Sequence, residues 1–258
     1  MKNIVIITGA SSGFGELFAL ELDRQLKSID EFWLIARNGE RMNEIAKAMR
    51  TPCRILSLDL TKDADIKTVI KAVEREADEC YDNLYVKMLI NNAGYGKIGE
   101  FIKIEDNDVS GMIDLNIKAL TVITKGLLPY MAKNSRIINI SSVAAFLPQP
   151  GFAEYAASKA YVLSFSRALR QEVEKRGISV LTVCPGPADT NFFNVADEEN
   201  RTPWYKKYFM VDPKKVVCKA IRDSKNKKEL SIYGFAMNGL YIFSKLVPHS
   251  LIVKFIKP

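Results

Sequence analysis

Three residues in the second half of the chain have the types and spacing needed for proton transfer. Tyr155 and Lys159 lie four positions apart, so on a helix both side chains project from the same face. A tyrosine, with a pKa of about 10, is a poor proton donor at neutral pH unless a neighbouring cation such as Lys159 lowers that pKa. Ser142 precedes Tyr155 by thirteen positions, at the end of an expected strand, where its hydroxyl can hydrogen-bond a substrate carbonyl oxygen. This set predicts acid–base chemistry on a carbonyl or an alcohol.

A glycine-rich turn near the N-terminus predicts a phosphate-binding loop. The apolar run Ile4–Ile7 leads into Thr8-Gly9-Ala10-Ser11-Ser12-Gly13-Phe14-Gly15, and an apolar-periodic segment follows. Glycines let the backbone approach a pyrophosphate, and the N-terminus of the next helix offers free N–H groups. An ordinary glycine-rich turn is the alternative, but the position after a first strand favours a dinucleotide site. Its candidate cofactor-binding residues are Gly9, Ser11, Ser12, Gly13, Phe14 and Gly15.

The residues after the second expected strand indicate which dinucleotide binds. An Asp or Glu at this point usually holds the ribose 2′-hydroxyl of NAD, whereas an Arg suits the 2′-phosphate of NADP. This chain has Ala36 followed by Arg37, and a guanidinium matches a phosphate in shape and charge. The sequence therefore favours NADP(H) over NAD(H). The alternative is a solvent-exposed arginine at the start of a helix.

The elements that position these residues alternate short β-branched runs with longer amphipathic segments, which predicts a parallel sheet covered by helices. We expect strands at Ile4–Thr8, Phe32–Ala36, Arg54–Leu58, Val86–Ile90, Arg136–Ser141, Ser179–Val183 and, more weakly, Leu230–Tyr233. Helices are expected near Gly15–Lys27, Arg41–Met49, Asp63–Glu79, Val109–Met131, Tyr155–Lys175 and Pro213–Arg222. The prediction is one α/β domain over residues 1–258, a Rossmann-type doubly wound sheet with ligands at the carboxyl ends of its strands.

Seven short motifs occur in a characteristic order along the chain. They are TGASSGFG at 8–15, Asp59-Leu60, NNAG at 91–94, Asn116 in DLNIKA, ISS at 140–142, YAASK at 155–159 and PGPADT at 185–190. With these motifs the chain resembles the short-chain dehydrogenase/reductase family over essentially its whole length. The resemblance implies that Tyr155 is the catalytic acid/base and that Ser142 orients the substrate oxygen. It also implies that Lys159 lowers the pKa of Tyr155 and holds the nicotinamide ribose, and that Asn116 supports a water-linked proton path.

The same resemblance implies further contacts to the cofactor. Asp59 and Leu60 are expected near the adenine, and the small residues of NNAG allow close approach of a flat ligand. The implied residues are Asp59, Leu60, Asn91, Ala93, Gly94, Tyr155, Lys159 and, at the nicotinamide end, Pro185, Gly186, Ala188 and Thr190. One departure is Pro187–Ala188, where the family often has a bulkier apolar residue.

The expected function is NADP(H)-dependent interconversion of a carbonyl and an alcohol, in a homodimer or homotetramer. A non-catalytic NADP(H)-binding sensor is the alternative, although a sensor could dispense with the Ser-Tyr-Lys set that this chain keeps. Sugar-nucleotide epimerases and dehydratases share Tyr-x-x-x-Lys but tend to have a longer C-terminal substrate region.

Composition excludes several other classes of function. The single histidine, His249, argues against multi-histidine metal sites, and no metal is expected. The four cysteines form no Cys-x-x-Cys pair and read as free thiols of a reducing compartment. The N-terminal apolar run is too short for a signal peptide or a membrane span, so a cytoplasmic location is expected. The net charge of +7 comes mostly from the part from Lys225 onward, which has six lysines and one acidic residue, Glu229, and no nucleic-acid partner is expected.

Two C-terminal segments should govern what the substrate is. Residues 190–211 are expected to cover it with aromatic side chains, namely Phe192, Phe193, Trp204, Tyr205, Tyr208 and Phe209, and Tyr95 and Phe146 are expected to add to them. This lining suggests an apolar or bulky substrate, with packing of the loop itself as the alternative. Residues 232–258 are expected to be an ordered tail over the substrate side or a subunit contact. Because Gly234, Asn238, Gly239 and Pro248 interrupt its apolar runs, only weak peripheral membrane contact is considered, and no anchor.

Overall fold

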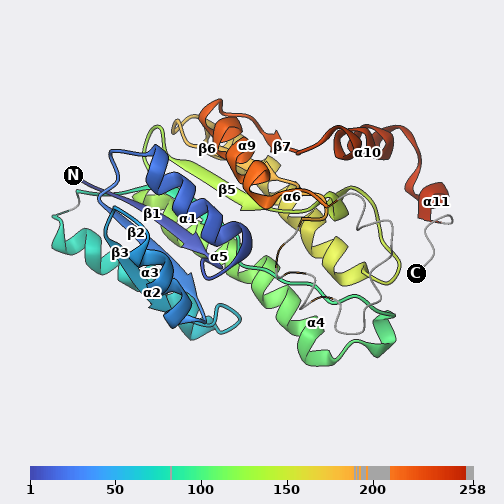
Figure 1. Cartoon of the computed structure of the whole chain (residues 1–258), viewed down its shortest axis with the longest axis horizontal. Coiled ribbons are helices and arrows are strands. Elements are labelled where there is room, and N and C mark those ends of the chain that lie inside the picture. The colour runs from blue at the N-terminus through green and yellow to red at the C-terminus, as the bar shows by residue number, and fades with distance from the viewer. Residues whose placement is uncertain (82, 189, 191, 193–195, 197–209, 254–258) are drawn as a thin grey trace.

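The computed structural model describes residues 1–81, 83–188, 190, 192, 196 and 210–253. One sheet of seven parallel strands forms its centre, in the order β3-β2-β1-β4-β5-β6-β7 (Figure 1). The strands are β1 (Lys2–Thr8), β2 (Glu31–Ala36), β3 (Cys53–Ser57), β4 (Leu84–Asn91), β5 (Arg136–Ile140), β6 (Ser179–Val183) and β7 (Leu230–Ser231). The Rossmann-type parallel sheet predicted from the sequence is confirmed.

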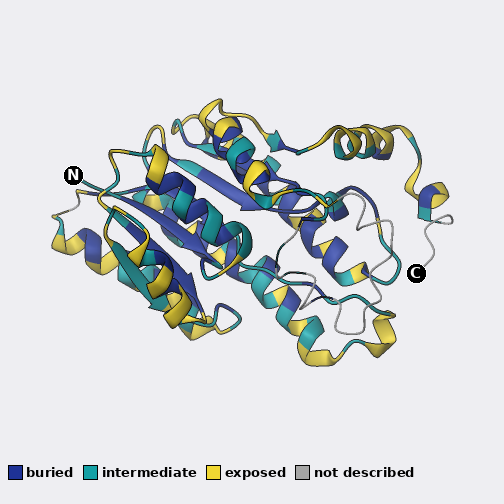
Figure 2. Cartoon of the chain, in the orientation of Figure 1, coloured by how far each residue is buried: buried dark blue, intermediate teal, exposed yellow. Residues whose placement is uncertain are grey.

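Helices cover both faces of this sheet because its apolar residues alternate between them. Ile4 and Ile6 of β1 pack with α3 (Asp63–Glu79), α5 (Leu120–Leu127) and α6 (Ala153–Glu174). Val5 and Ile7 pack on the opposite face with α1 (Gly13–Gln25), α2 (Gly39–Lys47) and α9 (Pro213–Lys225). Strands β1, β2, β5 and β6 are accordingly buried along most of their length, whereas the edge strand β3 is only partly buried (Figure 2).

The long helix predicted at Val109–Met131 is divided into shorter pieces. It consists of α4 (Asp106–Ile113), a π-helical segment η2 (Asp114–Ala119), α5 and a 3₁₀ turn η3 (Leu128–Tyr130). Pro129 lies in the 3₁₀ turn, where its missing N–H does not interrupt the preceding α-helix. Periodicity alone does not distinguish one long helix from α-helical and π-helical turns in series, so the sequence missed the π-helical segment that carries Asn116.

The remaining elements are short or lie after the sheet. Two 3₁₀ turns, η1 (Phe101–Lys103) and η4 (Val143–Phe146), follow β4 and β5. The predicted seventh strand forms only two ladder pairs with β6. The tail continues into α10 (Phe235–Leu246) and α11 (His249–Ile252), which extend from the end of β7 (Figure 1).

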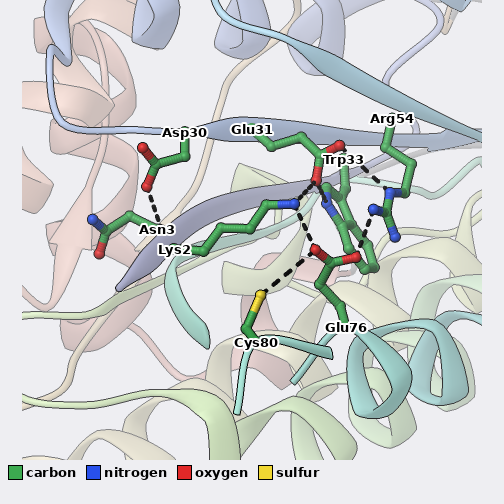
Figure 3. A network of polar contacts seen from close by, with 8 residues as sticks. All are labelled: Lys2, Asn3, Asp30, Glu31, Trp33, Arg54, Glu76 and Cys80. Atoms are coloured by element: carbon green, nitrogen blue, oxygen red, sulfur yellow. Dashed lines mark hydrogen bonds and ion pairs between the residues drawn. The ribbon is translucent and has the colours of Figure 1, made fainter. Parts of the chain in front are cut away.

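A network of charged side chains joins three strands to α3 (Figure 3). The carboxylate of Glu76 on α3 accepts hydrogen bonds from Lys2 Nζ and from an Arg54 guanidinium N–H, each at 2.6 Å. Glu31 forms ion pairs with the same two cations, at 3.0 Å to Lys2 and 3.5 Å to Arg54. The Arg54 guanidinium also stacks 4.4 Å above the ring of Trp33. Oppositely charged groups therefore link the starts of β1, β2 and β3 to one helix.

Candidate active site

A cavity of about 750 Å³ lies at the carboxyl ends of the central strands. It brings together most of the residues that the sequence predicts for the site. Those lining it are Gly9, Ser11, Ser12, Gly13, Phe14, Arg37, Asp59, Leu60, Ala93, Gly94, Ser142, Tyr155, Lys159, Pro185, Gly186, Ala188 and Thr190. Gly15, Asn91 and Asn116 are predicted site residues outside this lining, and each has a contact that explains its position.

The glycine-rich loop is held tightly against the end of β4. Gly9 has a φ of +65°, and a Cβ placed there would lie 2.8 Å from Asn92 Nδ2. A Cβ on Gly15 would lie 2.2 Å from the carbonyl oxygen of Gly9, so helix α1 can begin this close to the loop only with glycine. The Asn92 side chain donates hydrogen bonds to the carbonyls of Thr8 and Gly9, at 3.1 and 3.0 Å.

The two asparagines of the NNAG motif have different positions. Asn91 is buried, and its amide donates to Thr124 Oγ1 at 2.9 Å and to Asn139 Oδ1 at 2.8 Å. It ties β4 to β5 and α5 below the cavity. Asn92, which the sequence analysis left out of the site, lines the cavity and fixes the glycine-rich loop. Alternation of side chains along an extended backbone was the signal that could have distinguished the two.

Ser142 and Tyr155 meet at the centre of the cavity. Ser142 is the N-cap of η4, its hydroxyl accepts a hydrogen bond from Ala144 N at 3.1 Å, and it lines the cavity together with Tyr155. The ring of Tyr155 stacks on Phe152, with centroids 4.3 Å apart, and lies 5.2 Å from the ring of Phe192. These contacts fix the position of the phenol ring.

Lys159 lies one turn further along α6 and is buried beside the same phenol. Its Nζ donates to the Ile140 carbonyl at 3.1 Å and lies 5.6 Å from the Tyr155 ring centroid. A Cβ on Gly94 would lie 3.1 Å from this Nζ and 2.8 Å from Asn116 Oδ1. Glycine at position 94 therefore leaves the space in which the ammonium group lies.

Burial controls the ionisation of both groups. It raises the pKa of Tyr155, and the nearby Ser142 opposes that rise without cancelling it. It lowers the pKa of Lys159 to about 8. The Lys159 ammonium donates to a carbonyl on β5, and its effect on the pKa of Tyr155 stays a prediction. Tyr155 is thus a neutral phenol at physiological pH.

The Asn116 side chain lies outside the cavity lining and joins two parts of the site by hydrogen bonds. Its Oδ1 accepts from Tyr95 N at 3.0 Å, and its Nδ2 donates to Tyr95 O at 2.8 Å and to Ser158 Oγ at 3.0 Å. Ser158 Oγ in turn donates to the carbonyl of Tyr155 at 2.8 Å. The π-helical segment therefore connects the residues that follow β4 to α6, the helix that carries Tyr155.

One end of the cavity presents a cation and polar groups next to β2 and β3. Arg37 is exposed at its mouth and Asn38 caps α2 by accepting from Arg41 N at 2.9 Å. Asp59 accepts from the Thr61 hydroxyl at 2.9 Å, which holds the turn after β3. Burial raises the pKa of Asp59, but hydrogen bonds from Thr61 and the charge of Arg37 outweigh it and lower that pKa.

The predicted nicotinamide end is formed by the segment after β6. Val211 N donates to the carbonyl of Pro187 at 3.0 Å, and Ala188 pairs with Val211 in a short parallel bridge. Ala188 is buried, so the departure at Pro187–Ala188 places a small side chain in the cavity wall. Thr190 lies beside Gly13, whose φ is +56° and whose Cβ would be 3.6 Å away. The glycine-rich loop and this segment therefore face each other.

Aromatic residues line the cavity beside Tyr155, and the sequence predicts some of them. Tyr95, Phe152 and Phe192 line the cavity, together with the polar Asn107, Asp108, Ser110 and Gln149, which sequence reasoning missed. Phe146 does not line it, because it packs against Tyr241 of α10. The other aromatic residues of the 190–211 segment, Phe193, Trp204, Tyr205, Tyr208 and Phe209, lie outside the described residues.

Two further expectations concern what the described residues do not contain. In residues 1–81, 83–188 and the later described stretches, no cluster of His, Cys, Asp and Glu side chains could hold a metal ion. None of the helices described is long and apolar enough to cross a bilayer.

A parallel doubly wound sheet with a glycine-rich loop and a Ser-Tyr-Lys set in one cavity defines a dinucleotide-dependent oxidoreductase. The family model described as short chain dehydrogenase matches residues 3–201. This chain belongs to the short-chain dehydrogenase family and is an enzyme acting on C=O or CH–OH groups.

Individual relatives agree with this assignment. An uncharacterised oxidoreductase of Staphylococcus epidermidis is 34% identical over 192 residues, covering 73% of this chain and 79% of that protein. A short-chain dehydrogenase from Sphingobium yanoikuyae, solved in complex with NADPH, superimposes with a TM-score of 0.78 at 26% identity and covers 96% of this chain and 97% of that one. A bulky-bulky ketone specific alcohol dehydrogenase from Comamonas testosteroni gives a TM-score of 0.74 at 26% identity, with 94% and 92% covered.

Proposed function

We propose that this protein is an NADP(H)-dependent oxidoreductase that interconverts a bulky or apolar carbonyl compound and its alcohol, with Tyr155 as the acid/base. The observation that carries the proposal is that Ser142, Tyr155 and the buried Lys159 line the same cavity as the glycine-rich loop. A non-catalytic sensor would need the loop but not this buried set.

The residues present fit a nicotinamide dinucleotide. The loop has glycine where a Cβ would collide with the Gly9 carbonyl or with Asn92, which leaves its backbone bare toward the cavity. The pyrophosphate would lie against Ser11 to Gly13 at the start of α1, the adenine near Asp59 and Leu60, and the nicotinamide near Pro185 to Thr190. When bound, the cofactor supplies or accepts the hydride.

Arg37 supports the preference for NADP(H) over NAD(H). Its side chain is exposed at the cavity mouth beside Asn38, the N-cap of α2. The position directly after β2 therefore holds an arginine and not an acidic residue. A 2′-phosphate there would meet a guanidinium and the positive end of a helix dipole. The NADPH complex of the Sphingobium relative agrees with this preference.

Proton transfer follows from the ionisation of the two buried groups. A Tyr155 with a raised pKa holds its proton at neutral pH, and the positive charge of the nearby Lys159 would favour release of that proton to an oxygen on which negative charge develops. Ser142 stabilises the same oxygen through its hydroxyl. Lys159 holds a positive charge below a pH of about 8 and stabilises the phenolate left behind. Hydrogen bonds of Asn116 join the residues after β4 to this helix through Ser158. A water-linked path that replaces the proton would run past Asn116.

The substrate end of the cavity supports a bulky carbonyl compound. Tyr95, Phe152 and Phe192 provide flat apolar surface next to the phenol, and they come from different segments of the chain. The specificity for bulky ketones named for the Comamonas structure is consistent with such a lining. The polar residues at the far wall would then contact a carbonyl compound that carries additional polar groups.

The other parts of the proposal concern the state of the whole protein. We propose a single domain, because the described residues share one sheet, and a homodimer or homotetramer in the cytoplasm. The four cysteines are free thiols, as expected in a reducing compartment.

A panel of carbonyl substrates tests the proposed function. Purified protein is mixed with NADPH and with aldehydes, keto-lipids, steroids and sugars, and oxidation of NADPH is followed by absorbance. We expect turnover with bulky apolar ketones and faster reaction with NADPH than with NADH. Binding of NADPH without turnover of any carbonyl or alcohol would favour the sensor instead.

A further inference from the structure

Helices α10 and α11 have one face packed on the body of the protein. Met237 lies against Gly186, where a Cβ would be 2.8 Å from the methionine sulfur, and Tyr241 packs on Phe146 with ring centroids 4.9 Å apart. Leu240 and Ile252 belong to the same apolar cluster. These contacts fix the two helices at the end of β7, beside the segment that closes the nicotinamide end.

The opposite face of these helices is apolar and open to solvent. Phe235 is 96% exposed and Leu246 is 76% exposed, although both are large hydrophobic side chains. The exposed large hydrophobic side chains of this face, which we name the outer face, are Phe235, Ile242, Phe243, Leu246 and Leu251. Figure 2 shows α10 with exposed residues along its length, away from the main body. Isolated exposed hydrophobics are ordinary, whereas five gathered on two consecutive short helices indicate a binding surface.

Three of the four residues that interrupt the apolar runs in the sequence lie at helix starts or carry no side chain, and the fourth is the polar Asn238 within α10. Gly234 has a φ of +90° and is the N-cap of α10, and Pro248 is the N-cap of α11. Gly239 is exposed with nothing within 4 Å of the position of a Cβ, and it leaves the outer face flat. Gly234 and Pro248 therefore lie at helix starts and not within the apolar face.

The charges around the outer face are positive. The chain has no acidic residue after Glu229, while Lys245, Lys254 and Lys257 follow it. The Glu229 carboxylate is paired with Arg167 at 2.7 Å. Lys245 is exposed next to the apolar residues. An apolar surface bordered by positive charge is complementary to an anionic lipid surface. A second copy of the chain would bring the two Lys245 side chains to one interface, and this like charge disfavours self-association through this face.

We propose that the outer face of α10 and α11 binds the surface of an anionic membrane, with the helices lying in the plane of the interface. The apolar side chains enter the boundary between headgroups and acyl chains, and Lys245 contacts the anionic headgroups. The remainder of the protein stays in water, with the cavity at the carboxyl ends of the strands beside the membrane-bound helices.

Flotation of the full-length protein with vesicles tests the proposal. One set of vesicles contains phosphatidylcholine alone and the other contains phosphatidylcholine mixed with phosphatidylglycerol, each at low and at physiological salt. We expect flotation with the anionic vesicles, reduced by salt and weak with the neutral ones. The double variant Phe235→Ser and Leu246→Ser should lower the bound fraction by roughly tenfold or more, since each large apolar side chain contributes on that order when it leaves water.

Matched controls separate this result from unfolding and from self-association. Ile102→Ser removes an equally exposed side chain on η1 and should leave flotation unchanged. The double variant should keep its thermal unfolding midpoint and its NADPH affinity, because the two side chains face solvent. Failure of the wild-type protein to float with anionic vesicles overturns the proposal, as does equal flotation of the double variant. A smaller oligomer on light scattering of the double variant, without loss of flotation, assigns the face to contact between copies and also overturns it. Neither readout requires turnover, so failure of the proposed enzymatic activity would be seen separately.

Discussion

At the scale of single residues, the site buries two ionisable groups beside each other, and within the described part of the chain neither of them forms an ion pair. The Tyr155 phenol and the Lys159 ammonium are both almost inaccessible to solvent. Burial favours the neutral form of each, which keeps the proton on the tyrosine and brings the titration of the lysine near the physiological range. The two residues therefore have ionisation properties that differ from those of the same side chains on a surface helix.

Tyr155→Phe tests the role of the phenolic proton. The ring would keep its contacts with Phe152 and Phe192, and Ser142 would keep its hydrogen bond from Ala144 N. We expect kcat for carbonyl reduction to fall by about 10²–10⁴-fold, the usual contribution of general acid catalysis, while the Kd for NADPH and the unfolding midpoint change little. Activity close to that of the wild type would remove Tyr155 from the mechanism.

The charge of Lys159 predicts the pH dependence of the reaction. Its pKa is lowered to about 8, so the ammonium form is present below that pH and is lost as the pH rises through it. The neutral amine cannot stabilise the phenolate that forms when Tyr155 gives up its proton. We expect kcat for reduction to decline above pH 8, as measured with saturating NADPH, while circular dichroism shows the fold unchanged. A profile that stays flat well into the alkaline range contradicts this assignment.

Arg37→Ala tests the choice of cofactor. The guanidinium would pair with a 2′-phosphate that only NADPH carries, and loss of such a bond costs about 1.5–3 kcal/mol, or roughly 10- to 150-fold in Kd. Fluorescence titration should show this loss for NADPH and almost none for NADH. Arg41→Ala is a suitable control, because Arg41 lies on the adjacent helix α2 but is paired with Glu16 and Glu44. Equal binding of NADH and NADPH by the wild-type protein would contradict the preference.

At the scale of elements, the division between α4 and α5 gives the site its rigidity. The π-helical turn directs Asn116 at both backbone polar groups of Tyr95, just after the strand end that borders the cavity. Ser158 extends the connection to the carbonyl of Tyr155. The Asn116 side chain thereby joins the residues after β4, the π-helical turn and, through Ser158, helix α6.

Asn116→Ala would leave the N–H and C=O of Tyr95 without these partners. Unsatisfied buried backbone groups cost about 1–3 kcal/mol each. We expect the free energy of unfolding in urea to fall by at least that amount and kcat to fall as well, because the position of Tyr155 depends on the same network. Thr121→Val, which removes a hydroxyl on neighbouring α5 that bonds Tyr161, should affect stability much less. A variant with unchanged stability would show that the hydrogen bonds of Asn116 do not hold these segments together.

At the scale of the whole molecule, the charged network of Figure 3 joins the starts of β1, β2 and β3, at the opposite end of the strands from the cavity. Burial raises the pKa of Glu76, but hydrogen bonds from Lys2 and Arg54 outweigh it and lower the pKa below its ordinary value. A carboxylate with a lowered pKa in the folded state stabilises the fold above its ordinary pKa and loses that contribution as the pH falls through the folded-state pKa.

Glu76→Gln should therefore lower stability at neutral pH and change its dependence on acid. We expect a loss of about 1–3 kcal/mol in the free energy of unfolding, the range for hydrogen bonds to charged groups. The difference between wild type and variant should shrink as the pH falls through the acidic range, as measured by urea unfolding. Glu74→Gln, on the same helix without a resolved partner in this network, is the control. A difference independent of pH would contradict the assignment.

Much of this architecture could be predicted from the sequence because local patterns determine it. Strands β1 and β6 are rich in β-branched residues and β2 is a mostly apolar run, and all three are buried. The motif residues follow strand ends, so their meeting at the carboxyl ends of the strands follows from parallel topology. Most predicted cofactor residues and the Ser142–Tyr155–Lys159 set do lie in one cavity. The helix boundaries within 109–131 could not be predicted, because a π-helical turn has no distinct hydrophobic period.

The parts that could not be predicted depend on contacts between distant residues. Which asparagine of NNAG faces the cavity depends on where strand β4 ends, and the ionisation of Tyr155 depends on how deeply α6 is buried. The tail was misread in one respect, since Gly234 and Pro248 count as interruptions in composition but are caps in the structure. A residue's effect on an apolar face depends on its place in the helix, which composition does not contain.

The order of strands in the sheet also determines how the chain must emerge during synthesis. β1 ends at Thr8, but its inner neighbour β4 begins only at Leu84. At roughly 5–20 residues per second, a ribosome needs on the order of several seconds to supply that partner. During this interval the apolar strand Ile4–Ile7 has one unpaired edge, which is the kind of surface that promotes aggregation. Folding of this protein in the cell should therefore be most vulnerable before residue 91 has left the ribosome, well before any part of the Ser-Tyr-Lys set has been made.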